Sequence, residues 1–414
     1  MAAMDSPRRV DLTVHGLAHG GDGVGRLPDG KACFVAAAIP GERVTAEVTE
    51  ERARFARAVT VEVLEPVAER VTPSCPLALP ERCGGCRLQH IDVVHQAVLL
   101  HSVVVDTLER IGRIPAPPVA DTVRPHDGWG YRNQARFAPH PDGQLGFRRA
   151  GSHDIEPVAE CPLLDPGAAA ARDAAGDDWR GVEAVVVRGD ADARALLEVL
   201  PGAGGLPALP SGDVPVAVVG TDGAVALRGE PLLEERAAGR TWRVSPTSFF
   251  QPSRAGADTL AALVRAAAEV TPGTLALDLY AGVGLFAAVL AEDGAQVVAV
   301  EAHPAAAADA RANLRDLDVE VRCGAAEDAL DAHGPRPDVI VLDPPRRGAG
   351  PALTARIAEA AARRIVMVSC DPAALARDAR VLLDGGWQLD RVVPVDQFTH
   401  TAHVEAVATF TRAA

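Results

Sequence analysis

The chain is short of lysine: Lys31 is the only one among its 414 residues, so arginine carries nearly all of the positive charge. A drift of composition toward arginine and alanine explains this most simply, although arginine also suits phosphate recognition better than lysine does. The formal net charge of −15 argues against nucleic acid as a partner when it is taken over the whole chain. Because a binding face is local, the acidic total weakens that expectation without excluding it.

Long apolar runs and an export signal are also missing. No apolar run reaches membrane-spanning length without a charge or a proline. The first residues, MAAMDSPRRVDLTV, lack the apolar core of a signal peptide. The chain has seven cysteines, an odd number, which makes a disulfide framework a poor explanation. We therefore expect a cytoplasmic protein that contacts no membrane and uses cysteines for metal binding or catalysis.

The apolar and polar pattern divides the chain into three segments. Residues 1–65 alternate apolar and polar positions in short runs separated by glycine and proline turns, which suits a small β-barrel. Residues 66–240 mix one helical stretch (92–114) with strand patterns, which indicates a mixed α/β domain. Residues 241–414 alternate strands with helices, the pattern of parallel βαβ units in a doubly wound α/β sheet.

A glycine loop follows the apolar strand that ends in Asp278, in the stretch LDLYAGVGLF. Gly282 and Gly284 let the backbone approach a ligand closely, and Glu301 ends the next strand about 20 residues further on, where an acid can bind a ribose diol. The spacing misses the dinucleotide fingerprint G-x-G-x-x-G, because Leu-Phe-Ala follows Gly284. A nucleoside without a pyrophosphate, such as S-adenosylmethionine, fits this loop better.

Two further strand ends carry reactive side chains. Asp343 closes a strand in VLDPPRRG, and the prolines after it make a simple helix cap a weaker explanation. Cys370 follows another strand in RIVMVSCDPAALARD, where open α/β sheets place their ligands. Alone, Cys370 is either a buried thiol or a nucleophile. Because Asp278, Glu301 and Asp343 end strands on the same rim, the convergence favours a functional site.

Glu405 lies in the apolar run HVEAVATF. A carboxylate there is either exposed on an edge strand or buried with a raised pKa, and the spacing alone favours the exposed edge. A nucleophilic Cys370 would need a lowered thiol pKa, since a free thiol is only about 3% ionised at pH 7. We expect the N-terminus of the helix after Cys370 to lower it.

Three cysteines lie close together in CPLALPERCGGC, and a fourth stands in AECPLL. The spacing leaves two metal centres open, zinc in a four-cysteine site or a [4Fe–4S] cluster. Zinc sites more often pair two C-x2-C units, so one triplet with a distant cysteine favours iron–sulfur. Four cysteine ligands leave no open iron, which favours a closed structural site. The expected ligands are Cys75, Cys83, Cys86 and Cys161.

Five motifs occur in one order: SFFQP, LDLYAGVGLF, LDPPRRG, SCDPAALARD and HTAHVE. In these motifs, and over essentially its whole length, the chain resembles the RNA uracil-5 methyltransferases that act on tRNA and on 23S rRNA. The resemblance implies a TRAM domain of the oligonucleotide-binding type in residues 1–65, the cluster in residues 66–240, and a Rossmann-like methyltransferase domain in residues 241–414. It implies RNA as the partner, and S-adenosylmethionine and a [4Fe–4S] cluster as cofactors; we expect a monomer.

The same resemblance makes Cys370 the nucleophile and Glu405 the base. C5 of uracil is too unreactive to take a methyl group unaided. A thiolate that adds to C6 makes C5 nucleophilic, and a base must then remove the C5 proton so that the thiol can leave. Leu285 departs from the asparagine often found there, which removes one expected hydrogen bond to the cofactor. The implied cofactor contacts are Gln251, Tyr280, Glu301 and Asp343, together with Gly282 and Gly284 of the loop.

Three functions stay open at this point. A 23S rRNA uridine-5 methyltransferase is favoured, because the TRAM-like segment and the cluster usually accompany rRNA substrates in this family. The alternatives are the tRNA T-loop uridine enzyme and a non-catalytic RNA-binding or assembly factor, and the intact Cys370 and Glu405 count against the last. Cytosine-5 methyltransferases usually carry a Pro-Cys motif, and no Pro-Cys dipeptide occurs in the chain.

Overall fold

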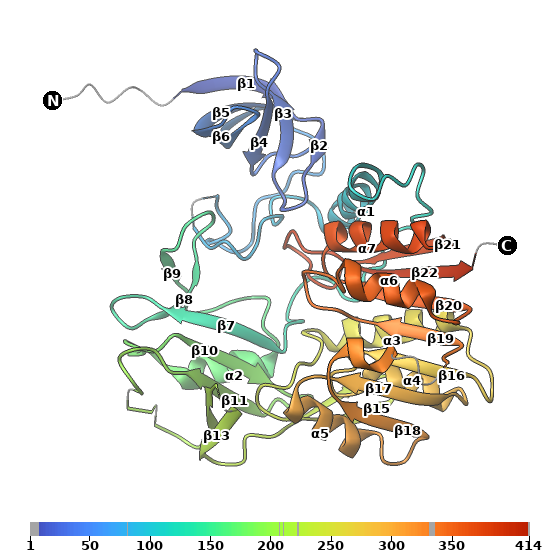
Figure 1. Cartoon of the computed structure of the whole chain (residues 1–414). Coiled ribbons are helices and arrows are strands. Elements are labelled where there is room, and N and C mark those ends of the chain that lie inside the picture. Colours follow the sequence, from blue (N-terminus) through green and yellow to red (C-terminus); the bar gives the residue numbers. More distant parts are fainter. Residues whose placement is uncertain are drawn as a thin grey trace.

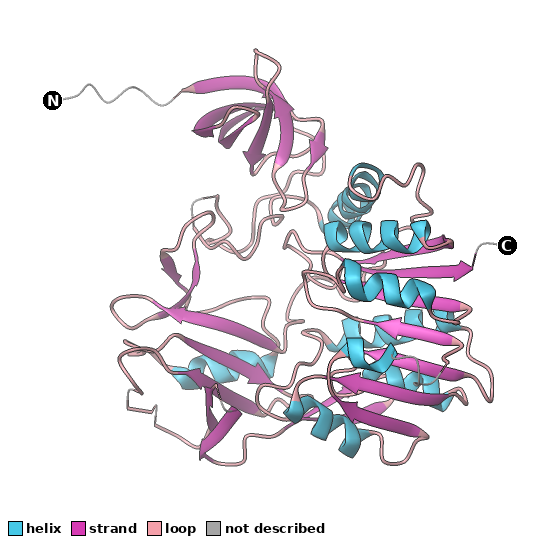
Figure 2. Cartoon of the chain, in the orientation of Figure 1, coloured by secondary structure: helices cyan, strands magenta, loops and turns pink. Residues whose placement is uncertain are grey.

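The computed structural model describes residues 8–80, 82–206, 208–209, 211–221, 223–330 and 336–412. Residues 1–7 of the expected first segment and residues 413–414 of the third lie outside the described residues. The described chain forms a small N-terminal β-unit, a central sheet and a larger sheet flanked by helices (Figures 1 and 2).

The N-terminal unit is a curved six-stranded sheet, at the top of Figure 1, in the order β1-β5-β6-β4-β3-β2. Alternate residues of β4 and β5 are buried, among them Cys33, Val35, Val44 and Ala46, as the period-2 pattern predicts. The strands are β1 (Arg9–Thr13), β2 (Gly16–Leu17), β3 (Gly23–Arg26), β4 (Ala32–Ala36), β5 (Arg43–Glu51) and β6 (Phe55–Glu65).

The central sheet has seven strands in the order β13-β12-β11-β10-β7-β8-β9. Helix α2 (Pro166–Ala175) packs on it and begins at Asp165, whose side chain accepts the Ala168 N–H. A separate hairpin of β14 (Leu233–Ala237) and β15 (Arg240–Val244) leads onward. The sheet strands are β7 (Gln134–Pro139), β8 (Leu145–Arg148), β9 (Ile155–Pro157), β10 (Ala184–Gly189), β11 (Ala195–Leu200), β12 (Val216–Gly220) and β13 (Gly223–Arg228).

The C-terminal sheet follows the order β18-β17-β16-β19-β20-β22-β21. Its first five strands are parallel, as the alternating pattern predicts, and β22 pairs antiparallel with both β20 and β21. The strands are β16 (Leu275–Leu279), β17 (Gln296–Glu301), β18 (Val319–Cys323), β19 (Val339–Leu342), β20 (Arg364–Ser369), β21 (Trp387–Val395) and β22 (Glu405–Arg412). The helices are α3 (Arg254–Ala268), α4 (Leu285–Glu292), α5 (Pro304–Asn313), α6 (Pro351–Glu359) and α7 (Pro372–Asp384), with a short 3-10 helix at Ala326–Leu330.

Helix α1 (Val93–Arg110) stands apart from the central sheet and packs beside α7, on the right in Figure 1. Its buried face includes Leu100, Val104 and Leu108, which share one apolar core with Leu375 and Trp387 of the C-terminal unit. The sequence places this helix in the segment 66–240, whereas its packing joins it to the larger sheet. Among the helices of the described residues, none has the length and apolar content needed to cross a membrane.

Candidate active site

A cavity of about 600 Å³ lies at the carboxyl ends of the parallel strands. Ligands in open α/β sheets bind at this edge, and the volume is in the range of small-molecule sites. Of the eight catalytic and cofactor-binding residues expected from the sequence, seven line this cavity: Gln251, Tyr280, Gly282, Glu301, Asp343, Cys370 and Glu405. Gly284 lies in the same loop as Gly282 without lining the cavity.

The glycine loop between β16 and α4 has a backbone that most residues avoid. Tyr280, Gly282 and Gly284 have φ values of 62°, 56° and 101°. A Cβ added at Gly284 would come within 2.6 Å of Leu314 Cδ1, so a larger residue would displace the loop. Glu301 fixes the other side, because its carboxylate accepts the Gly282 N–H at 2.9 Å and the His303 N–H at 2.6 Å. The loop is therefore held open beside the carboxylate that we expect to bind a ribose.

Buried carboxyl groups lie at the inner side of the site. Burial, with smaller contributions from the charges of Asp343 and Glu301, raises the pKa of Asp278 to about 8, while a hydrogen bond from the Ala287 backbone opposes the shift. Burial also raises the pKa of Asp343, while a hydrogen bond from Gln251 opposes the shift. Leu285, where the family resemblance implies an asparagine, is buried in the first turn of α4. Carboxyl groups close to such a loop suit a positively charged nucleoside.

Cys370 and Glu405 lie at the ends of two neighbouring strands. Strands β20 and β22 run antiparallel, and their pairing ends with Ser369 opposite Ala406; Cys370 directly follows β20, and Glu405 is the first residue of β22. Paired strands are about 5 Å apart, which brings both side chains to one end of the cavity. The thiol and the carboxylate therefore share one ligand space.

The exposed-edge expectation for Glu405 is wrong. Strand β22 lies between β20 and β21, and Glu405 is only 3% exposed. Burial raises the pKa of Glu405 well above its usual value, the charge of Asp343 adds to this shift, and a hydrogen bond from Gln397 and the charge of Arg346 oppose it. The structure agrees with the other expectation, a buried Glu405 with a raised pKa.

The expected lowering of the thiol pKa is also wrong for the chain without ligands. Burial raises the pKa of Cys370 to about 12, and the charges of Glu405 and Asp343 act in the same direction. Helix α7 does begin next to the thiol, with Asp371 as its cap accepting the Ala374 N–H at 2.7 Å. Desolvation outweighs the favourable helix terminus here.

Sequence reasoning missed several side chains that line the cavity. Phe398, in the loop between β21 and β22, lines the cavity, and its buried neighbour Gln397 lies behind the lining, where it bonds both Gln251 and Glu405. Phe249 lines the cavity while 57% exposed, which leaves an aromatic ring at the rim. The other missed lining residues with ionisable side chains are Arg132, Arg136, Arg346 and His403. Phe249, Arg346 and His403 lie within the motifs SFFQP, LDPPRRG and HTAHVE, so membership of these motifs was a usable signal.

The four expected metal ligands come from two loops that the fold brings together. Burial raises the pKa of Cys83, and charges on Cys161 and Cys75 would raise it further, so these thiols lie within electrostatic reach. The pKa of Cys86 is also raised, first by burial and then by charges on the other three cysteines. Within the described residues, however, no three His, Cys, Asp or Glu side chains are arranged to hold a metal ion. The zinc and iron–sulfur expectations therefore stay predictions.

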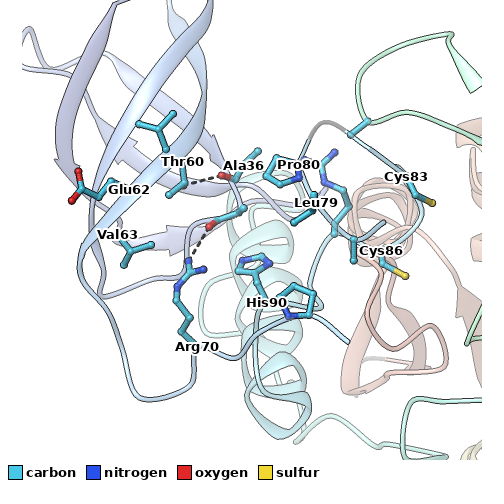
Figure 3. A pocket seen from close by; sticks show the side chains of 16 residues that line it. Ala36, Thr60, Glu62, Val63, Arg70, Leu79, Pro80, Cys83, Cys86 and His90 are labelled. Atoms are coloured by element: carbon cyan, nitrogen blue, oxygen red, sulfur yellow. Dashed lines mark hydrogen bonds between the residues drawn. The ribbon is translucent and has the colours of Figure 1, made fainter. Parts of the chain in front are cut away.

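A second cavity, of about 270 Å³, separates the N-terminal sheet from the cysteine loop (Figure 3). The sulfur atoms of Cys83 and Cys86 point away from the sheet in this view. Arg70 joins the two parts, because it donates to the Ala37 carbonyl at 2.9 Å and pairs with the fully buried Glu42 at 2.5 Å. The cysteine loop is thus anchored to the N-terminal unit.

Comparisons with known proteins agree with the site. Residues 8–61 match the TRAM domain, residues 253–367 the methyltransferase small domain, and residues 328–413 the tRNA (uracil-5-)-methyltransferase family. A Streptomyces coelicolor protein described as an uncharacterized RNA methyltransferase is 40% identical, covering 96% of this chain and 92% of its own length.

Two relatives carry more specific descriptions. A 23S rRNA (uracil(1939)-C(5))-methyltransferase of Halomonas elongata is 33% identical, covering 97% of this chain and 89% of its own length. The crystal structure of the Pyrococcus abyssi tRNA (uracil-54, C5)-methyltransferase with S-adenosyl-L-homocysteine has a TM-score of 0.74 at 25% identity, covering 97% of this chain and 100% of that one. With this likeness along nearly its whole length, the chain belongs to the S-adenosylmethionine-dependent RNA uracil-C5 methyltransferases.

Proposed function

We propose that the protein methylates C5 of a uridine through a covalent bond between Cys370 and C6 of the base, with Glu405 as the general base. The observation that supports this proposal is that Cys370 and Glu405 both line one cavity, at the ends of the paired strands β20 and β22. Addition of the thiolate to C6 makes C5 nucleophilic, and C5 takes the methyl group. Glu405 then accepts the C5 proton, and the electron pair of that bond expels the thiolate.

We propose that the residues expected from the sequence contact the cofactor. When bound, S-adenosylmethionine supplies a methyl group on a cationic sulfonium. Glu301, whose carboxylate holds the glycine loop open, is proposed to bind the ribose diol. Gln251, Tyr280 and Asp343 would contact the rest of the cofactor, since all three line the same cavity. The buried carboxyl groups suit its positive charge.

For the substrate we propose 23S rRNA. The Halomonas relative, which modifies 23S rRNA according to its name, is 33% identical over almost the whole chain. tRNA is the second candidate, supported by the likeness to the Pyrococcus tRNA enzyme at a TM-score of 0.74. Since the substrate is RNA and none of the seven cysteines forms a disulfide, we propose a cytoplasmic location.

The substrate is tested by transfer of labelled methyl groups to separated, unmodified 23S rRNA and tRNA, with the modified nucleoside mapped. 5-Methyluridine in 23S rRNA alone supports the first candidate, and 5-methyluridine in tRNA alone supports the second. Cys370→Ser should abolish transfer while S-adenosylmethionine binding remains. Transfer that survives Cys370→Ser would refute the covalent route.

We further propose that Cys75, Cys83, Cys86 and Cys161 hold a [4Fe–4S] cluster. Four free, partly buried thiols that converge from two loops suit a cluster, which is ligated by cysteine thiolates. Protein purified without oxygen should contain about four irons per chain. Cys86→Ser should lose this iron and Cys323→Ser, at an exposed cysteine outside the group, should keep it. One zinc per chain instead of iron would refute the proposal.

A further inference from the structure

Four side chains link the base to the cofactor side of the cavity. Gln397 Nε2 donates to Glu405 Oε2 at 3.3 Å and to Gln251 Oε1 at 3.0 Å. Gln251 Nε2 in turn donates to Asp343 Oδ2 at 3.2 Å. The amide orientations are mutually consistent, because each carboxylate faces an amide N–H and the two N–H groups of Gln397 serve two different acceptors. A reversed Gln397 amide would set its oxygen against the Glu405 carboxylate.

Gln397 is held firmly in this position. Its side chain is completely buried, and its backbone carbonyl contacts His126 Nε2 at 3.2 Å. Gly256, in the first turn of α3, leaves room for the amide: a Cβ at that position would lie 2.1 Å from Gln397 Oε1. A buried polar side chain without water around it keeps the few hydrogen bonds that the protein offers. The loop between β21 and β22 therefore presents a fixed donor to Glu405.

The other oxygen of the carboxylate is left for chemistry. Within the described residues, Glu405 Oε1 has no hydrogen-bond partner, whereas Oε2 accepts from Gln397. A donor on one oxygen fixes the plane of the carboxylate and leaves the second oxygen to accept a proton. The charged and titratable groups around Glu405 are Asp343 and Arg346 on the loop after β19 and Cys370 after β20. The only neutral amide that bonds Glu405 among the described residues is Gln397.

We propose that Gln397 is a positioning residue that holds the Glu405 carboxylate in its reactive orientation in the cavity, an inference that rests on the proposed role of Glu405 as the base. Gln397 does not touch the reacting atoms. It acts through Glu405 by stabilising the ionised, proton-accepting form, and Gln251 fixes the amide from the other side. The five motifs of the family resemblance assign it no role, since it stands just before HTAHVE.

The test compares the pH dependence of kcat in wild type and Gln397→Met, which keeps the side-chain volume and removes both donors. Loss of a hydrogen bond to a charged carboxylate should move the acid limb of the profile upward by about 1–2 pH units. At a pH below the acid limbs of both proteins, kcat of Gln397→Met should be about 10- to 100-fold lower than that of wild type. The KM for RNA of the two proteins should agree within about twofold. The covalent RNA adduct should persist longer, because removal of the C5 proton is the slowed step.

Gln96 provides a matched control. It is also completely buried; its amide nitrogen donates to the Leu88 and Ile91 carbonyls and its amide oxygen accepts the His400 N–H, and among the described residues none of its hydrogen bonds reaches Glu405. Gln96→Met should lower stability without moving the acid limb. If Gln397→Met does not fold, Gln397→Asn keeps an amide that is too short to reach both partners, and the same shift is expected.

The outcomes separate the two proposals. If wild-type protein methylates no uridine in RNA, the proposed function fails. If wild type is active and the acid limb of Gln397→Met and Gln397→Asn coincides with that of wild type, the positioning role alone is refuted. In a Glu405→Gln background, Gln397→Met should cause no further slowing of adduct release, since both changes act on one step. Additive slowing would also overturn the inference.

Discussion

The raised pKa of Cys370 makes alkylation of this thiol a direct test of the site's electrostatics. Burial, then the charges of Glu405 and Asp343, raise the pKa from 9.0 to about 12. Only the thiolate reacts, and each pKa unit changes its fraction about tenfold at a pH below both values. In protein without RNA or cofactor, Cys370 should therefore react with iodoacetamide about 10³-fold more slowly than in the urea-unfolded chain.

The assay is a time course of alkylation between pH 7 and 10.5, with each cysteine quantified by peptide mass spectrometry. If alkylation is slow because the thiol is not ionised, its rate should rise about tenfold per pH unit up to the highest pH. If it is slow because the reagent has limited access, its rate should level off at the pH where an ordinary thiol is ionised. At pH values where Glu405 is ionised, Glu405→Gln should accelerate the reaction, because it removes the nearby charge that raises the thiol pKa most. A plateau near pH 9, or a rate equal to that of the unfolded chain, would refute the reasoning.

Three further predictions concern the base, the buried acid and the contact between units. Glu405→Gln should let a covalent RNA–protein adduct accumulate on denaturing gels, and no adduct with a good substrate would weaken its role as base. The folded protein holds the proton of Asp278 up to a pKa of about 8, whereas the ordinary pKa is 3.8, so the free energy of unfolding falls as the pH rises between these two values. In Asp278→Asn, the decrease of the unfolding free energy with pH, measured by urea unfolding, should be smaller by up to about 1.4 kcal/mol per pH unit. A slope equal to that of wild type would contradict the raised pKa of Asp278. Arg254→Met, which breaks pairs to the buried Asp165 and Glu235 at 2.5 and 2.6 Å, should cost about 3–5 kcal/mol in the same assay. Arg265 is more exposed, so Arg265→Met should lower the free energy of unfolding by less than about 1 kcal/mol. Equal decreases in the two variants would show that the buried ion pairs of Arg254 add no stability.

The parallel part of the fold could be predicted because its signals are local. A buried strand, a glycine or proline break and an alanine-rich helix repeat along residues 275–384, and each break marks the carboxyl end of a strand. Parallel strands put all of those ends on one edge. Asp278, Glu301, Asp343 and Cys370 could thus be assigned to one rim without knowledge of the strand order.

The location of Glu405 could not be predicted, because it depends on strand order. After β21 the chain turns back and inserts β22 between β21 and β20, so the last strand of the sequence is not the last strand of the sheet. A short apolar run reads the same at an edge and in the interior. The raised pKa of Cys370 escaped prediction for a related reason, since desolvation depends on packing by distant segments. Gln397 has no signal of its own in the sequence.

The net charge of −15 misleads about RNA because the charges are sorted by depth. Asp278 and Glu405 lie in the interior, where their raised pKa values favour the neutral form and so reduce their field at the surface. Arg136 and Arg346 are exposed residues at the cavity lining, where an RNA backbone would approach. Arginine keeps its charge at any working pH and matches phosphate geometry. The near absence of lysine therefore does not weaken phosphate binding at the site. The surface next to Cys370 is therefore more favourable to RNA than the net charge of the chain indicates. The electrostatic field at this surface acts on an approaching polyanion more strongly than distant charges do.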